Sequence, residues 1–330
     1  MTDKTFSRVC IFGAGAIGGW IGAHLAKAGC DVRMVARGAT LQALQQAGLR
    51  LEQAGQTLSV PVRASANPAE LGVQDLVVVA VKAPAMADVA RAIAPLLGPD
   101  TVVLTAMNGV PWWFFQGFGG AYEGRQLQAV DPTGEIGRAI PARHLVGCVV
   151  HASCALHGPG FVRHHFGQRL IIGEPSGRVS ERVGALSALL QRAGFEAPVS
   201  QQIQRDAWYK LWGNMTVNPV SALTGATTDL ILADDLLRGF ISSVMLEARE
   251  IGARIGIPID QQPEDRHAIT RKLGAFRTSM LQDVDAGKPV ELDALVTVVR
   301  EIGQMTGTAT PWTDALLGLA RVHARVHGLY

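Results

Sequence analysis

The chain has 330 residues, of which 48% are hydrophobic and 18% charged, and its formal net charge is +2 at pH 7. This balance excludes an intrinsically disordered chain, and it supplies no basic surface for nucleic acid or for an anionic membrane. The length allows two domains of ordinary size, each with its own core. We expect a globular protein of the cytoplasm, because no signal-peptide pattern precedes the first predicted strand.

The first predicted element is a strand over Val9–Phe12, followed by a glycine-rich turn and a helix that runs to Ala28. The turn consists of Gly13, Ala14, Gly15, Ala16, Ile17 and Gly18. Glycines in such a turn let backbone approach a pyrophosphate closely, and the helix N-terminus that follows favours anionic oxygens. The strand, the GxGxxG turn and the helix therefore predict a dinucleotide site. A kinase glycine loop is the alternative, but no V-A-I-K or H-R-D string follows.

The second predicted strand ends at Ala36, beside the position that decides which dinucleotide binds. An acid there accepts the ribose hydroxyls of NADH, whereas an arginine accommodates the 2′-phosphate of NADPH. This chain has Arg37, and a guanidinium can bind a phosphate through two parallel hydrogen bonds. We therefore predict that the cofactor is NADPH. The alternative for Arg37 is a solvated arginine at a helix start.

Strands and helices alternate through the next part of the chain. Apolar strands are predicted at Val32–Val35, Leu76–Val81 and Val102–Thr105. Helices are predicted between them, at Leu41–Ala47 and Ala85–Leu97. The alternation is typical of a mostly parallel sheet covered by helices on both faces, and so predicts a Rossmann-type α/β domain.

Hairpins and a final helix complete this first domain. One hairpin is predicted over residues 49–62, and Val146–Leu156 and Val162–Ile172 form a second one around a Gly-Pro-Gly turn. Both would add antiparallel strands to the same sheet. A helix over Val179–Ala193 and a strand near Glu196–Val199 are expected to close the domain.

The pattern changes after residue 200. Over residues 201–330, apolar side chains recur at spacings of three and four with almost no alternating segment. We therefore predict an all-α domain there, after an α/β domain of residues 1–200, with ligand in the crevice between them. The four cysteines lack CxxC spacing and are expected to be reduced core residues. No histidine pattern has metal-ligand spacing, so we expect no metal.

The first helix of the second domain carries Lys210, Asn214 and Asn218 at a spacing of four. This spacing places an ammonium group and two amides on one helical stripe. Asparagine is unfavourable inside a helix, so a stripe that faces a ligand explains both asparagines, and a solvent-exposed face is the alternative. Reduction of a ketone builds negative charge on the carbonyl oxygen and needs a proton donor beside it, for which Lys210 is our candidate.

Taken in order, these motifs resemble those of the ketopantoate reductase family. The resemblance covers most of the chain. It is carried by the glycine turn, Val35-Ala36-Arg37-Gly38, Val81-Lys82, Asn108-Gly109, the Pro159-Gly160 hairpin that ends in Ile172-Gly173-Glu174, the K-x3-N-x3-N-P helix, and S-M-L-Q-D followed by P-x-E-x-D.

The resemblance implies reduction of a 2-oxo acid with NADPH, and first of all of ketopantoate to D-pantoate, with Lys210 as the proton donor. The residues that it implies for substrate binding are Asn108, Asn214, Asn218 and Ser279. The residues that it adds to the cofactor site are Lys82, Asn108 and Glu291. Without the resemblance, these positions are also ordinary for helix starts and turns. The expected partner is a small 2-oxo acid, and we expect no nucleic-acid or membrane partner. The sequence leaves open whether the chain forms a homodimer.

Two features depart from the family pattern. Thr228 stands where family members carry a further substrate-binding asparagine. Aromatic residues at 112–115 open a glycine-rich stretch that reaches Arg143, either as a lid over the site or as packed structure. These departures leave open a reductase of another branched or aromatic 2-oxo acid. An alternative of another class is a non-catalytic dinucleotide sensor, which would need no proton donor at Lys210.

Overall fold

The computed structural model describes residues 6–330. The chain divides into two compact units. Unit 1 comprises the chain up to residue 107 together with residues 113–125 and 133–203, and unit 2 comprises residues 108–112, 126–132 and 204–330. Short segments between residues 108 and 132 therefore pack with the C-terminal part of the chain.

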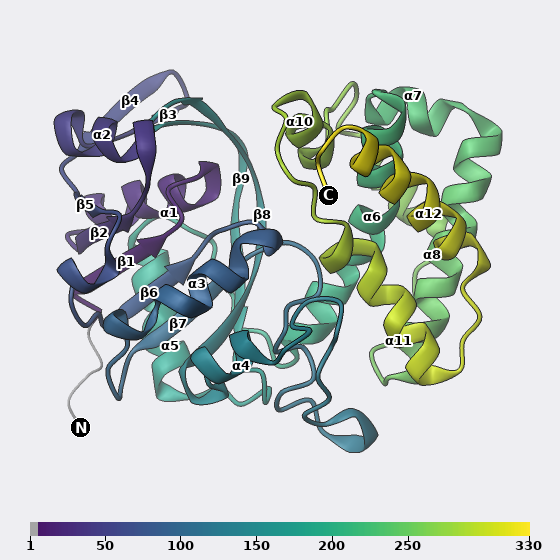
Figure 1. Ribbon diagram of the computed structural model, residues 1–330, viewed down its shortest axis with the longest axis horizontal. Coiled ribbons are helices and arrows are strands. Elements are labelled where there is room, and N and C mark those ends of the chain that lie inside the picture. The colour runs from purple at the N-terminus through teal and green to yellow at the C-terminus, as the bar shows by residue number, and fades with distance from the viewer. Residues whose placement is uncertain (1–5) are drawn as a thin grey trace. The chain divides into compact units, whose positions relative to one another are not determined.

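Across the described residues, unit 1 is built on a nine-stranded sheet of order β4-β3-β9-β8-β7-β6-β1-β2-β5 (Figure 1). The strands are β1 Arg8–Phe12, β2 Asp31–Val35, β3 Leu49–Gln53, β4 Gln56–Val60, β5 Arg63–Ser65, β6 Leu76–Val79, β7 Val102–Ala106, β8 Leu145–Gly158 and β9 Phe161–Gly173. The strands from β5 through β8 in this order are all parallel. The order reverses beside β1, as in dinucleotide-binding sheets, and this confirms the predicted fold class.

Helices cover this sheet and supply its core. They are α1 Ala16–Lys27, α2 Gly38–Ala47, α3 Met86–Ala92, α4 Glu135–Ala139 and α5 Glu181–Arg192. Trp20 of α1 and Leu186 of α5 are fully buried in one apolar cluster with Ile11 of β1. Every residue of β6 and β7 is buried, as expected for strands covered on both faces.

Both predicted hairpins are present, with one difference in direction. β3 and β4 pair antiparallel, and so do β8 and β9. However, β8 runs parallel to β7, and β9 runs parallel to β3. The long hairpin therefore continues the parallel part of the sheet through β8, and only its second strand reverses.

Two predicted elements were wrong in extent. The strand expected at Glu196–Val199 makes only two isolated bridges, from Glu196 to Arg169 and from Val199 to Ile172. The helix expected over Ala85–Leu97 is the shorter α3, flanked by 3₁₀ turns. Pro95 lies in the second of these turns, where its missing N–H prevents continuation of the α-helical bonds.

The aromatic residues at 113–115 pack within unit 1, whereas Trp112 belongs to unit 2. Phe114 and Phe115 have no exposed surface, and Trp113 Nε1 donates a hydrogen bond to Thr105 Oγ1 at 3.1 Å. The glycine-rich chain that follows is held by Glu123, whose carboxylate accepts hydrogen bonds from the N–H groups of residues 117 and 119. The packed reading of this segment is therefore confirmed for these aromatic side chains.

Unit 2 is helical, as predicted. Its helices are α6 Ile203–Thr224, α7 Thr228–Ala233, α8 Asp235–Arg254, α9 Pro263–Arg271, α10 Ser279–Asp285, α11 Val298–Thr306 and α12 Pro311–Val326. Trp208 and Trp212 fix α6 against α8, because their buried Nε1 groups donate to the carbonyl oxygens of Ala248 and Met245 at 3.2 and 2.7 Å. Within residues 6–330, no helix combines the length and the apolar character needed to cross a membrane.

Candidate functional site

The three glycines of the turn between β1 and α1 have three different surroundings. Gly13 has φ of +108°, and a Cβ there would lie 2.7 Å from Val81 Cγ1. A Cβ on Gly18 would overlap the carbonyl oxygen of Gly13 and lie 2.9 Å from Ile11 Cγ2. A Cβ on Gly15 would meet nothing within 4 Å. The fold itself therefore requires Gly13 and Gly18, whereas Gly15 leaves open space over the backbone.

This open space lies at the N-terminus of α1, for which Gly15 is the N-cap residue without a side-chain cap. The first N–H groups of a helix lack partners within the helix and favour an anion. Ala16, Ile17 and Gly18 form the first turn of that helix. The turn therefore fits a pyrophosphate, and contacts from these residues stay a prediction.

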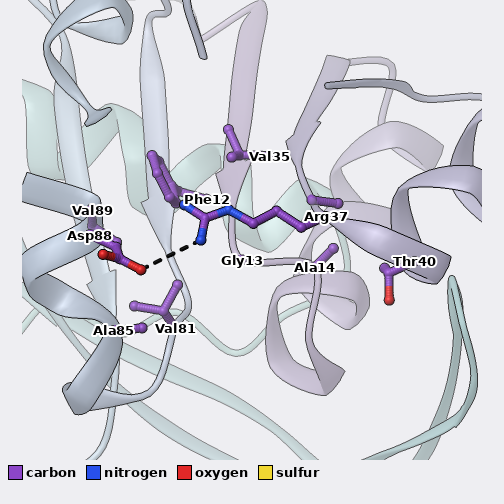
Figure 2. A pocket seen from close by; sticks show the side chains of 11 residues that line it. Phe12, Gly13, Ala14, Val35, Arg37, Thr40, Val81, Ala85, Asp88 and Val89 are labelled. Carbon is purple, nitrogen blue, oxygen red and sulfur yellow. Dashed lines mark hydrogen bonds and ion pairs between the residues drawn. The ribbon is translucent and has the colours of Figure 1, made fainter. Parts of the chain in front are cut away.

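A pocket of about 250 Å³ opens beside this turn in unit 1 (Figure 2). Its lining comes from the chain at and after the ends of β1, β2 and β6 and from the starts of α2 and α3. The residues are Phe12, Gly13, Ala14, Val35, Ala36, Arg37, Thr40, Val81, Ala85, Asp88 and Val89. A pocket at the carboxyl ends of parallel strands, where the strand order reverses, is the usual place for a dinucleotide.

Arg37 lies in this pocket, as the N-cap residue of α2. Its side chain is 67% exposed and reaches across the pocket to α3 (Figure 2), where Arg37 Nη1 lies 3.5 Å from Asp88 Oδ2. Asp88 also pairs with Arg91, whose Nη2 lies 2.5 Å from Asp88 Oδ1. The hydrogen bond from Arg91, together with the charges of both arginines, holds the pKa of Asp88 below its usual value.

Lys210 and Asn108 meet in unit 2. Lys210 Nζ donates a hydrogen bond to Asn108 Oδ1 at 2.8 Å, although 102 residues separate them. The turn that carries Asn108 is held by Gly109, with φ of +80°, and by Val110, whose N–H donates to Ala294 O at 2.8 Å. A Cβ on Gly109 would overlap Ala294. The structure therefore brings together two of the predicted site residues.

The rest of the polar stripe on α6 is not a solvated face. Asn214 is half-buried and Asn218 is only 7% exposed. Ser279 is the half-buried first residue of α10, and Glu291 is buried just before a π-helical turn at Asp293–Thr297. The burial of Asn218 and the bond at Lys210 argue against the solvent-face alternative. Substrate contacts at these residues remain a prediction.

Two other positions lie outside the lining of this pocket. Lys82 follows Val81 of the pocket, but its own side chain is exposed and is not among the lining residues. Thr228 is buried, and its Oγ1 donates a hydrogen bond to Gly274 O at 2.7 Å. The Thr228 hydroxyl therefore bonds within unit 2, at the position where the family pattern has an asparagine amide.

The sequence interpretation missed several pocket residues, above all Asp88 and Thr40. A usable signal was present. Residues that follow neighbouring parallel strands gather at one edge of the sheet, so Asp88, soon after β6, belongs to the same edge as Gly13 and Arg37.

Burial raises the pKa of the Cys10 and Cys154 thiols to about 12, which leaves both neutral and agrees with their prediction as core residues.

Comparisons with known proteins give matches along nearly the whole chain. The family model described as "Ketopantoate reductase PanE/ApbA" matches residues 9–177, and the model of its C-terminal domain matches residues 202–324. A 2-dehydropantoate 2-reductase of Mesorhizobium japonicum is 46% identical over 324 residues, covering 98% of this chain and 99% of the relative.

One solved structure supports this family assignment, and a second, more distant one shares only the fold. A crystal structure described as a "putative ketopantoate reductase from Ralstonia solanacearum MolK2" matches with a TM-score of 0.96 and 58% identity. The match covers 99% of this chain and 100% of that one. A D-mandelate dehydrogenase solved with NADH and anilino(oxo)acetate shares the fold, with a TM-score of 0.83 at 20% identity, over 98% and 99% of the two chains. The chain belongs to the ketopantoate reductase family.

Proposed function

We propose that the protein reduces a 2-oxo acid with NADPH, and that ketopantoate is the substrate and D-pantoate the product. The observation that carries this proposal is the full-length likeness to a relative named 2-dehydropantoate 2-reductase at 46% identity. The glycine turn, the pocket with Arg37 and the Lys210–Asn108 pair supply chemistry that this reaction needs.

In this reaction the bound cofactor supplies a hydride to the C2 carbonyl carbon. Lys210 gives a proton to the carbonyl oxygen, so that the product is the 2-hydroxy acid. Asn108 accepts a hydrogen bond from the ammonium group and thereby limits the directions in which Lys210 can point. Donors with fixed orientation stabilise charge that develops on an oxygen better than mobile water does.

The remaining predicted residues have supporting roles in this proposal. Asn214, Asn218 and Ser279 offer amide and hydroxyl groups that can hold a carboxylate and a hydroxyl without adding charge. Lys82 and Glu291 bind the cofactor in this proposal. Variants at each position that raise KM for the 2-oxo acid or Kd for NADP⁺ would assign them.

NADPH is proposed over NADH because of Arg37, which lines the pocket at the start of α2. Reversing its charge in Arg37→Asp should remove the preference, because a carboxylate repels the 2′-phosphate and accepts ribose hydroxyls. The measurement is kcat/KM for NADPH and for NADH in wild type and variant. An unchanged ratio would show that Arg37 does not select the cofactor.

A panel of 2-oxo acids, followed through nicotinamide absorbance, tests the substrate. Ketopantoate should have the highest kcat/KM. The second candidate is an aromatic 2-oxo acid, favoured by the shared fold with a D-mandelate dehydrogenase and by Thr228 in place of a family asparagine. Dinucleotide binding without turnover of any acid would favour the sensor alternative. The cytoplasmic location stays a prediction from the sequence.

We also propose a homodimer through α12. Trp312, Ala315, Leu319, Val322 and Val326 are all exposed and follow one another at spacings of three and four. Such spacing is typical of a helix that pairs with another helix, and in a two-fold dimer one stripe serves both copies. Light scattering after size exclusion should give a dimer mass for wild type and a monomer mass for Val322→Glu. A wild-type monomer would contradict the proposal.

A further inference from the structure

The cofactor pocket contains a carboxylate that faces the arginine expected to bind the 2′-phosphate. Arg37 and Asp88 both line the pocket, from the starts of α2 and α3. Figure 2 shows the Arg37 side chain extended across the pocket toward Asp88. Arg37 Nη1 lies 3.5 Å from Asp88 Oδ2. A negative charge at this place opposes the attraction of a phosphate to Arg37.

We propose that Asp88 competes with the 2′-phosphate for Arg37 and thereby limits the preference of the site for NADPH over NADH. This inference rests on the proposed function of Arg37. It concerns a second residue that sets cofactor selectivity, on a different element and 51 positions further along the chain.

The competition follows from charge. A phosphate monoester carries about −1.5 to −2 charges near neutral pH, and NADH lacks this group. Asp88 stays ionised at neutral pH, because Arg91 and Arg37 hold its pKa below the usual value. When Arg37 binds the phosphate, the nearby Asp88 carboxylate repels this second anion. This repulsion weakens the binding of NADPH through its 2′-phosphate, a group that NADH lacks.

Arg91 holds the Asp88 carboxylate in place beside Arg37. Its contact with Asp88, 2.5 Å, is shorter than the 3.5 Å contact of Arg37. Asp88 can therefore stay with Arg91 while Arg37 turns to the phosphate. The Arg37–Asp88 contact joins side chains that are 67% and 49% exposed, and such pairs are weak. The loss of this contact therefore opposes phosphate binding only weakly.

The experiment measures binding to the full-length protein by calorimetry, with NADP⁺, NAD⁺ and 2′,5′-ADP as probes. Asp88→Asn keeps the side-chain size and removes the charge. We expect it to lower Kd for NADP⁺ and 2′,5′-ADP on the order of threefold at low salt and to leave Kd for NAD⁺ unchanged. The gain should vanish at about 0.5 M salt, where the charges are screened.

Glu135→Gln is the matched control. Glu135 Oε1 lies 4.0 Å from Arg91 Nη1, and Glu135 is not among the residues that line the pocket. It should change none of the three Kd values. Weaker NADP⁺ binding by Asp88→Asn would overturn the inference, because Asp88 would then orient Arg37 for the phosphate. An equal gain in the control would also overturn it, by showing an effect of net charge.

A failure of the NADPH proposal would give a different result from a failure of the Asp88 inference. If wild type binds NAD⁺ as tightly as NADP⁺, and Arg37→Ala alters neither Kd, then NADPH selection by Arg37 is wrong. If Arg37→Ala weakens NADP⁺ while Asp88→Asn changes nothing, the cofactor proposal holds and the competition by Asp88 is refuted.

Discussion

Two glycines of the same turn should respond to alanine in opposite ways. Gly15 has φ of −80° and ψ of −169°, which alanine adopts without strain, and its Cβ would meet nothing within 4 Å. At Gly18 the added Cβ would overlap the Gly13 carbonyl oxygen and crowd Ile11 Cγ2 at 2.9 Å. Gly15→Ala therefore tests ligand binding, and Gly18→Ala tests packing of α1 on β1.

The expected magnitudes separate these effects. Alanine at the N-cap is somewhat less favourable than glycine, while the less flexible unfolded chain gives a gain, so Gly15→Ala should change the free energy of unfolding by less than about 1 kcal/mol. Gly18→Ala should cost about 1–3 kcal/mol through overpacking, or roughly 2–12 °C in Tm for a domain of this size. A Cβ that keeps a phosphate from the backbone N–H groups removes a charged hydrogen bond worth about 1.5–3 kcal/mol.

The assay combines thermal melting without ligand and calorimetric titration with NADP⁺. Gly15→Ala should melt close to wild type and bind NADP⁺ roughly ten- to hundredfold more weakly. Gly18→Ala should melt lower. If Gly15→Ala bound NADP⁺ as tightly as wild type, the open space above Gly15 would not be the pyrophosphate site, and the reasoning would be refuted.

Further predictions concern the second unit and pH. Lys210→Ala should lower kcat about 10²- to 10⁴-fold in stopped-flow or steady-state assays and leave Kd for NADP⁺ unchanged; near-normal turnover would remove Lys210 from the mechanism. Thr228→Val should cost about 0.5–1.5 kcal/mol in urea unfolding by removing the bond to Gly274 O, with KM for ketopantoate unchanged, whereas a raised KM would indicate substrate contact. Burial lowers the pKa of His24 from 6.5, so the unfolded chain takes up a proton first and stability should fall as pH decreases below 6.5. A His24→Gln variant should show a smaller decrease in Tm between neutral and acid pH, and an identical slope would contradict this.

The sequence predicts those parts of the site that depend on neighbouring residues. The roles of Gly13 and Gly18 follow from a strand, a tight turn and a helix in succession, and Arg37 follows from the next strand end. Lys210, Asn214 and Asn218 share a stripe because of helical spacing alone. Each of these patterns is local, so a single sequence is enough to find it.

Contacts between distant segments could not be predicted in this way. The bond from Lys210 to Asn108 and the pair of Arg37 with Asp88 join residues 102 and 51 positions apart. Strand β5 has three residues, too few for a recognisable alternation, and was not predicted. The chain at Glu196–Val199 reads as a strand, but it forms only two isolated bridges, to Arg169 and Ile172, within the described residues. These features are decided by packing.

The most direct test of hydride transfer to ketopantoate traces a deuterium label from the cofactor to the product. The full-length protein is given ketopantoate and NADPH deuterated at the transferred position of nicotinamide C4, and the product is examined by NMR and mass spectrometry. We predict D-pantoate with one deuterium on C2. Absence of the 2-hydroxy acid, or a product without the label, would contradict hydride transfer by this protein.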